Sequence, residues 1–158
     1  MNIAIPINPS EQELILACID RQSWAQQRIY EENYRLMMTV CMRYSNSADD
    51  AFDILHEGFL KVFTNIRTYE AGTLLQAWIR RIMVNTAIDF YRKESRRTTS
   101  DLDEARTLAY SHTHPIDSMA AEEVMKAVQK LPPMYRSVFN MFVIEGYSHR
   151  EIAETLNI

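Results

Sequence analysis

The sequence predicts an all-α protein of two small helical domains joined by a flexible linker. Its 158 residues include only 3 Gly and 5 Pro, so few positions favour turns. Apolar residues recur at helical spacing before residue 97 and after residue 118, and the stretch between these positions loses that periodicity. We therefore expect a first domain at residues 10–97, a linker at residues 98–117 and a second domain at residues 118–158.

The composition is that of an ordinary globular protein with an acidic balance. Hydrophobic residues make up 47% of the chain, charged residues make up 24%, and the formal net charge is -4. Any contact with DNA should therefore be confined to a local basic patch. No apolar run is long enough to cross a membrane, and no basic segment followed by an apolar run opens the chain. We expect a cytoplasmic protein without membrane insertion.

Cysteine and histidine are too sparse to predict a metal or redox site. Cys18 and Cys41 lie far apart among apolar neighbours, so we expect two buried, reduced thiols. His112 and His114 lie in the linker, but no nearby Cys completes a zinc site. The sequence also contains no paired nucleophile and base and no phosphate-binding Gly loop. We therefore expect no enzymatic activity and no cofactor.

Three helices are predicted in the first part of the chain. Ser10 precedes two glutamates at the start of the first, Ser23 with Gln26 forms a capping-box pattern at the second, and Ser47 begins the third. The residues expected to face inward are Leu14, Ile15, Cys18 and Ile19 in the first helix, Ile29, Tyr30, Leu36, Met37, Val40 and Cys41 in the second, and Ala51, Ile54, Leu55, Phe59, Val62, Phe63 and Ile66 in the third.

The opposite side of the third helix carries an acidic strip with one apolar residue, consisting of Asp53, His56, Glu57 and Leu60. We predict that this strip docks a basic partner, although a Leu among exposed polar side chains is also common on an ordinary surface. His56 has only carboxylates at helical spacing, so a surface contact is favoured over a metal role.

A strongly basic helix is predicted at residues 78–97. Six basic residues against two acidic ones give this segment a charge of +4. Its expected core face consists of Trp78, Ile82, Met83 and Phe90, and its expected polar ridge of Arg81, Asn85, Asp89, Arg92 and Arg96. Arg and Asn on one face can contact phosphates and base edges, but an ordinary solvated helix face is equally compatible with this pattern.

A short loop at residues 69–74 leads into this basic helix. It contains Tyr69, Gly72 and Thr73, and it is the Gly-containing break between two strong helices. A loop there would present backbone donors and an aromatic ring beside the ridge, which suits the holding of an unstacked base. An ordinary helix connector fits the composition equally well.

The last part of the chain has the pattern of a helix-turn-helix. Pro132 and Pro133 stop one helix and begin the next, Gly146 ends that one, and Ser148 with Glu151 forms a capping box for a last short helix. The expected inward residues are Met119, Ala120, Val124, Ala127, Val128, Leu131, Val138, Phe139, Phe142, Val143, Ile152, Ala153 and Leu156.

These motifs, in this order, resemble those of bacterial RNA polymerase sigma factors of the extracytoplasmic-function group. Residues 53–61 and 78–89 resemble the family's region 2, and residues 131–136 and 145–156 resemble its region 4. The resemblance implies a protein that binds RNA polymerase core, recognises promoter DNA near positions minus 10 and minus 35, and commonly has an anti-sigma factor. The alternatives are a helix-turn-helix DNA-binding regulator that acts without polymerase and a purely helical interaction protein.

The resemblance also assigns residues. It places Asp53, His56 and Glu57 against the polymerase clamp, the loop at residues 69–74 around a flipped base of the minus 10 element, and Asn85 with Asp89 beside that loop. His56 departs from the Gln that the family usually has. The sequence ends at Ile158 before a base-reading second helix, so we expect an incomplete helix-turn-helix that does not discriminate minus 35 sequences. We also expect it to leave Ile152, Leu156 and parts of Phe139 and Phe142 under-covered.

Overall fold

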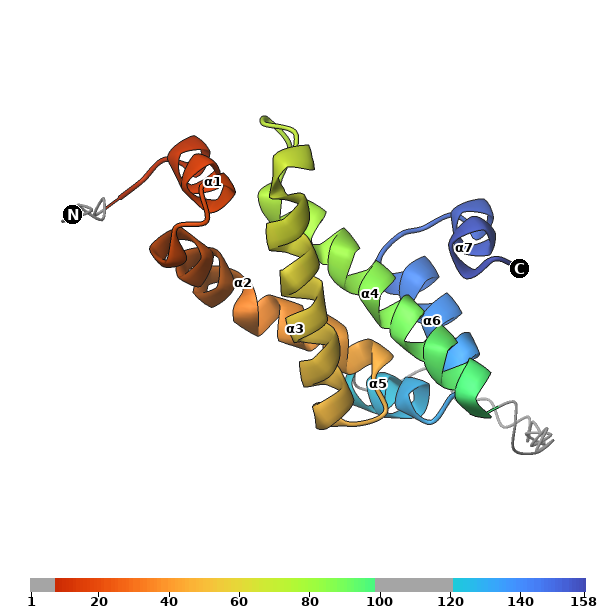
Figure 1. Cartoon of the computed structure of the whole chain (residues 1–158). Coiled ribbons are helices and arrows are strands. Elements are labelled where there is room, and N and C mark those ends of the chain that lie inside the picture. Colours follow the sequence, from red (N-terminus) through yellow and green to blue (C-terminus); the bar gives the residue numbers. More distant parts are fainter. Residues whose placement is uncertain (1–7, 99–120) are drawn as a thin grey trace, which may run out of the picture. The chain divides into compact units, whose positions relative to one another are not determined.

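The computed structural model describes residues 8–98 and 121–158, and every regular element within these ranges is helical (Figure 1). The chain divides into two compact units, Met1–Ala87 and Ile88–Ile158. This division falls inside helix α4 (Leu75–Thr98), whereas the sequence predicted it in the linker. The predicted linker and its two histidines lie outside the described residues. Within the described ranges, no helix has both the length and the apolar character that a bilayer crossing requires.

The first unit contains α1 (Glu11–Ile19), α2 (Ser23–Tyr44), α3 (Ala48–Asn65), the short 3-10 helix η1 (Ile66–Thr68) and the first part of α4. Helices α2 and α3 cross and contact each other (Figure 1), and α1 contacts both α2 and η1. The start of the basic helix is therefore supported by an all-helical scaffold.

All three predicted helix starts in this unit are confirmed, and two of them have the predicted Ser cap. Ser10 forms a capping box with Glu13, and the Ser47 side chain accepts a hydrogen bond from the Asp50 amide at 3.1 Å. The predicted capping box at Ser23 is wrong because Gln22 is the N-cap of α2 and makes no side-chain capping bond. Backbone hydrogen bonds close the α1–α2 turn, with the Gln22 amide donating to the Ala17 carbonyl at 2.9 Å.

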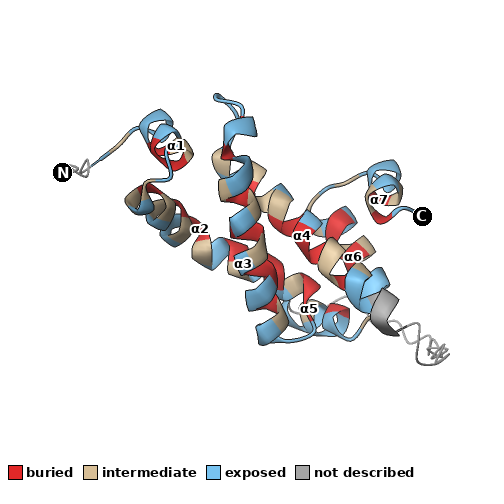
Figure 2. Cartoon of the chain, viewed as in Figure 1, coloured by how far each residue is buried: buried red, intermediate tan, exposed pale blue. Residues whose placement is uncertain are grey.

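The core of the first unit follows most of the predicted apolar stripes (Figure 2). The main error in α2 is Leu36, which is exposed. The fully or nearly fully buried predicted residues are Leu14, Cys18, Ile29, Met37, Val40, Cys41, Ala51, Ile54, Leu55, Phe59, Val62 and Ile66, and the half-buried ones are Ile15, Ile19, Tyr30 and Phe63.

The predicted core face of α4 needs a correction. Met83 is fully buried, but Trp78, Ile82 and Phe90 are only half-buried. The buried line consists of Ile79, Met83, Val84, Ala87, Ile88 and Tyr91. Gly58 of α3 lets the Met83 side chain lie directly against the α3 backbone, so the closest approach is set by that glycine rather than by the large aromatic residues.

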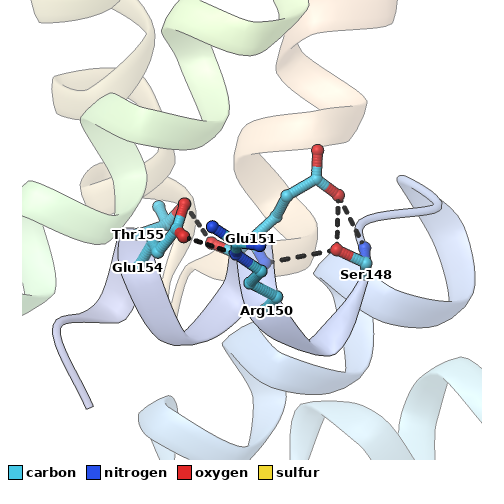
Figure 3. Close-up of polar contacts among 5 residues, drawn as sticks. All are labelled: Ser148, Arg150, Glu151, Glu154 and Thr155. Atoms are coloured by element: carbon cyan, nitrogen blue, oxygen red, sulfur yellow. Dashed lines mark hydrogen bonds and ion pairs between the residues drawn. The ribbon is translucent and has the colours of Figure 1, made fainter.

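The second unit contains the end of α4, α5 (Ala121–Gln129), α6 (Pro133–Phe139), the π-helical turn η2 (Asn140–Ile144) and α7 (His149–Leu156). Pro133 occupies the first position of α6, and Gly146 has a φ of 73° after η2, as the sequence predicted. The capping box of Ser148 and Glu151 is also confirmed, with the Glu151 carboxylate 2.8 Å from the Ser148 amide nitrogen (Figure 3).

The predicted inward residues of α5, α6 and η2 are confirmed only in part: Val128 is buried and Leu131, Val138 and Phe139 are half-buried, whereas Met119 and Ala120 lie outside the described residues. Val124 and Ala127 are exposed, as are Phe142 and Val143. The buried residues are Val128, Arg136, Ser137, Asn140 and Met141. A π-helical turn makes i→i+5 hydrogen bonds, so a pattern read with a period of 3.6 residues goes out of phase there.

Contacts within the second unit bury one arginine of α6 and two apolar residues of α7. The buried Arg136 side chain donates to the carbonyls of Gln129 and Leu131 at 3.0 and 2.9 Å, which ties the end of α5 to α6. The expectation of under-covered residues is wrong for Ile152 and Leu156, which are buried, but it holds for Phe142, which is exposed, and in part for the half-buried Phe139. Leu156 lines the same hollow as Ile88 and Tyr91 from the end of α4.

Candidate functional site

The exposed face of α3 carries two parallel lines of side chains that repeat every four residues. One line is Phe52, His56 and Leu60, and the other is Asp53, Glu57 and Lys61. Phe52 and Leu60 expose 39% and 68% of their surface. We call the six residues the α3 strip. The predicted residues Asp53, His56, Glu57 and Leu60 all lie on it.

Sequence reasoning missed Phe52 as a member of the α3 strip. Its ring centroid lies 6.1 Å from that of His56, and the two rings are tilted by 34°. The four-residue step from Phe52 to His56 and on to Leu60 was the signal that could have identified it, because such residues share one helix face. The strip is therefore more apolar than the sequence predicted.

The first half of the α3 strip is acidic. No Lys or Arg occurs between Ala48 and Leu60, whereas Asp49, Asp50, Asp53 and Glu57 do. Glu57 is half-buried, and its carboxylate oxygen lies 3.5 Å from the Lys61 Nζ one turn later. Such an i,i+4 pair on a helix surface contributes only about 0.3–0.5 kcal/mol, so a cationic partner can compete with Lys61 for Glu57.

Tyr69 anchors the loop at residues 69–74 to the rest of the first unit. This residue is buried, and its hydroxyl lies 2.9 Å from the Glu11 carboxylate of α1 and 2.5 Å from the Thr73 carbonyl oxygen. Burial, and next the Glu11 carboxylate, raise the pKa of the Tyr69 hydroxyl. The Tyr69 ring meets Trp78 edge-on, with centroids 5.6 Å apart. The expectation that the loop presents this ring to a base is therefore wrong.

The exposed tip of this loop consists of Gly72, Thr73 and Leu74. Gly72 has a φ of 94°, a left-handed conformation that favours glycine. The Thr73 hydroxyl donates to the Glu70 carbonyl at 2.8 Å, which closes a tight turn. Leu74 exposes 78% of its surface immediately before α4. The groups that the loop offers are thus backbone donors, a hydroxyl already engaged in the turn, and an apolar side chain.

The predicted polar ridge of α4 has two environments. Arg81 and Asn85 lie one turn apart in the first unit, and both are exposed. In the second unit, Asp89 and Arg92 are half-buried, with 3.6 Å between carboxylate and guanidinium, and Arg92 also donates to the Thr155 carbonyl. The Arg96 side chain lies outside the described atoms. The accessible part of the ridge is therefore Arg81 with Asn85.

The two cysteines lie in the core of the first unit rather than in a site. Burial raises the pKa of Cys18 to about 11 and that of Cys41 to about 12, so both thiols stay protonated at neutral pH. Among the residues that the structure describes, no group of three or more His, Cys, Asp and Glu side chains could hold a metal ion.

The second unit presents a short polar helix after a glycine turn. In α7 the Arg150 side chain is largely exposed, and its Nε lies 3.0 Å from the Glu154 carboxylate (Figure 3). The Thr155 hydroxyl donates to the Glu151 carbonyl at 2.7 Å on the same helix. The arrangement of α6 and η2, a turn at Gly146 and a capped α7 is that of the first half of a helix-turn-helix.

Two family models match the chain at these features. The model for Sigma-70 region 2 matches residues 29–97, which include the α3 strip, the loop and α4. The model for Sigma-70 region 4 matches residues 121–158. Together the matched ranges cover most of the described residues, and they come in the order that the sequence predicted.

The chain is similar in sequence to known sigma factors. It is 30% identical over 155 residues to the extracytoplasmic-function (ECF) sigma factor SigE of Mycolicibacterium smegmatis, which covers 95% of this chain but only 54% of SigE. It is also 30% identical to the ECF sigma factor SigW of Bacillus subtilis over 131 residues, covering 75% of this chain and 70% of SigW.

A solved structure shares the fold. The sigma factor RpoE, crystallised with the anti-sigma factor NepR from Bartonella quintana, matches 83% of this chain and 82% of its own chain, with a TM-score of 0.53 and 19% identity. The family models, the SigW match and this shared fold agree with the motifs of the sequence. The chain therefore belongs to the extracytoplasmic-function family of RNA polymerase sigma factors.

Proposed function

We propose that this chain binds RNA polymerase core through the α3 strip and engages the minus 10 promoter strand through the loop tip and the exposed part of α4. The observation that carries the proposal is the strip itself, which puts two exposed apolar side chains and two acidic ones on one face of a helix whose other face is core. Interfaces combine apolar anchors with charges that set register in this way. The role needs no catalytic group of its own.

The acidic half of the α3 strip should meet a basic surface of the polymerase. Replacing Asp53 and Glu57 by Lys reverses two charges without touching a buried side chain, so the fold should survive with a stability change of about 0.5 kcal/mol per site. We expect the Kd for core to rise about tenfold or more, because each acidic residue would face like charge. Fluorescence anisotropy with labelled protein and purified core measures this Kd.

A matched control is available on α2. Glu31 and Glu32 are exposed acidic neighbours away from the strip, and replacing both by Lys makes the same change in net charge. The control should bind core about as tightly as the parent protein. If the Asp53→Lys/Glu57→Lys variant is folded by circular dichroism and binds core like the control, the α3 strip is not the docking surface.

The loop tip and α4 should contact an opened DNA strand. Asn85 can make paired hydrogen bonds to a base edge, whereas Arg81 one turn earlier is suited to a phosphate. Asn85→Ala should reduce discrimination among minus 10 variants by about 1–3 kcal/mol. Arg81→Ala should weaken binding evenly across sequences and flatten its salt dependence. An unchanged ranking of minus 10 variants in Asn85→Ala would place the readout elsewhere.

The proposal also implies partners and a compartment. The RpoE structure holds an anti-sigma factor, and we infer by likeness of fold that this chain has such a partner as well. A protein that works on polymerase core and promoter DNA acts in the cytoplasm. Promoter-dependent transcription from core plus this chain, against core alone, tests the function as a whole.

A further inference from the structure

A groove of about 370 Å³ lies in the first unit, where the turn between α1 and α2 faces the end of α3 and η1. Its lining includes the apolar side chains of Leu60, Phe63 and Ile66 and two arginines, Arg21 from the turn and Arg67 from η1. Both arginines are exposed. Among the described residues that line the groove, none is acidic. It therefore combines an apolar surface with two cations.

Arg21 lines this groove in an unfavourable backbone conformation. Its φ is 57°, in the left-handed region that glycine normally occupies after a helix. Its amide donates to the Cys18 carbonyl at 3.0 Å, so the conformation belongs to the hydrogen-bonded end of α1. The Arg21 side chain supplies one of the two cations of the groove.

The groove continues the α3 strip but has the opposite charge. Leu60 belongs to both surfaces, and its side chain is 68% exposed. From Asp53 to Leu60 the helix rises by roughly 10 Å, so a single helical segment of a partner can cover both surfaces. Such a segment meets carboxylates first, then the apolar pair Leu60 and Phe63, and then two guanidinium groups.

We infer that the groove binds an acidic segment of RNA polymerase core that carries a large apolar side chain. The apolar side chain packs between Leu60 and Phe63, and the Asp or Glu side chains that follow it pair with Arg21 and Arg67. Charge complementarity favours an acidic occupant, because two arginines and no acidic residue face it. The shared Leu60 favours the same partner that docks on the α3 strip. The inference rests on the proposed function of that strip.

The test neutralises the two cations without disturbing the turn. In the variant Arg21→Gly/Arg67→Gln, glycine suits the left-handed conformation of residue 21, so the variant should fold at least as well as the parent. We expect its Kd for purified polymerase core to rise about fivefold or more at low salt, and the difference from the parent to shrink as NaCl is raised. The control is Arg35→Gln, an exposed arginine of α2 outside the groove, which should change the Kd less than twofold.

The outcomes separate this inference from the proposed function. If the groove variant binds core like the Arg35→Gln control while Asp53→Lys/Glu57→Lys loses affinity, the groove inference is overturned and the strip stands. A loss of affinity that does not depend on salt also overturns it, because charge pairing is then not the cause. If the parent protein does not bind core at all, the proposed function fails and the groove inference fails with it.

Discussion

Gly58 sets how closely α4 approaches α3, and adding one methyl group there tests this directly. A Cβ atom at residue 58 would lie 2.2 Å from the Met83 Sδ and 3.0 Å from its Cε. Met83 is fully buried, so it has little space into which it can move. Overpacking of this kind costs about 1–3 kcal/mol. Ala in place of Gly within a helix stabilises by about 1 kcal/mol, so Gly58→Ala should destabilise by a net of about 0–2 kcal/mol.

The sign of the effect should reverse when Met83 is shortened. Met83→Ala alone should cost about 2–5 kcal/mol, but it removes the atoms that the new methyl group meets. In that background Gly58→Ala should stabilise by up to about 1 kcal/mol, since only the helix propensity remains. Equilibrium urea unfolding of the parent, the two single variants and the double variant, followed by far-UV circular dichroism, gives the coupling energy.

Gly72 provides the matched control for this cycle. A Cβ at residue 72 would meet no atom within 4 Å, but the φ of 94° strains any other residue. Gly72→Ala should therefore cost about 1 kcal/mol through the backbone alone, equally in both Met83 backgrounds. If Gly58→Ala has the same effect with and without the Met83 side chain, within about 0.5 kcal/mol, the close approach is not what requires a glycine.

Three further changes have defined outcomes. Tyr69→Phe removes the hydroxyl that bonds Glu11 and the Thr73 carbonyl, so it should lower the free energy of unfolding by about 1–2 kcal/mol and speed amide hydrogen exchange in the loop. Unchanged exchange in the loop would contradict the anchoring role of this hydroxyl. Ser148→Ala should cost about 1 kcal/mol and raise exchange at the Glu151 amide, whereas full protection there would show that the cap is dispensable. Burial holds the Cys41 thiol protonated until its pKa of about 12, but the unfolded thiol loses its proton near its ordinary value, so stability should fall as pH rises above about 9. Urea unfolding at several alkaline pH values should show a shallower decline for Cys41→Ala, and equal slopes would count against it.

Helix starts were predictable where the capping chemistry is local. Ser10, Ser47 and Ser148 each bond an amide three residues later, and such bonds depend on sequence spacing alone. The helix start at Ser23 is correct, but its predicted capping box is wrong because Gln22 is the N-cap and backbone bonds through Arg21 and Gln22 close that turn. A capping-box pattern does not show whether the end of a preceding helix already closes the turn with backbone hydrogen bonds. The prediction failed because α1 ends directly before α2.

The buried face of a helix was predictable only where the helix has regular α geometry and the helix packed against it has no glycine at the contact. In α3 the period of 3.6 residues found the buried face almost completely. In α4 the small Gly58 moved the contact onto Met83, and in η2 the π turn shifted the phase, which left Phe142 exposed and buried Asn140. The apolar periodicity of α4 does not show that α3 has a glycine at their contact. The apolar periodicity of residues 133–144 does not show that a π turn lies there.

The residues of the α3 strip were mostly predictable from the sequence, whereas the packing of Tyr69 at the loop was not. The α3 strip was predictable because acidic residues opposite an apolar stripe are visible in the sequence, but Phe52 was missed because one aromatic residue among acidic ones does not by itself indicate an exposed apolar line. Tyr69 was assigned an exposed ring, whereas the structure buries it against Trp78 with its hydroxyl near Glu11. Glu11, which accepts a hydrogen bond from the Tyr69 hydroxyl, lies 58 residues earlier in the chain, and no local pattern predicts a contact over that separation.

The position of α1 bears on how this protein can be divided into fragments. The region 2 match begins at residue 29, inside α2, yet α1 contacts both α2 and η1 and supplies Glu11 to Tyr69. A recombinant fragment cut at residue 29 would lose the first turns of α2 and open the apolar surface on which Cys18 is packed. Such a fragment should aggregate on expression, whereas one that starts ahead of Ser10 keeps the capped start of α1 and the whole of this packing. Boundaries for crystallisation or spectroscopy of the first unit are therefore better drawn from side-chain contacts than from the limits of family similarity.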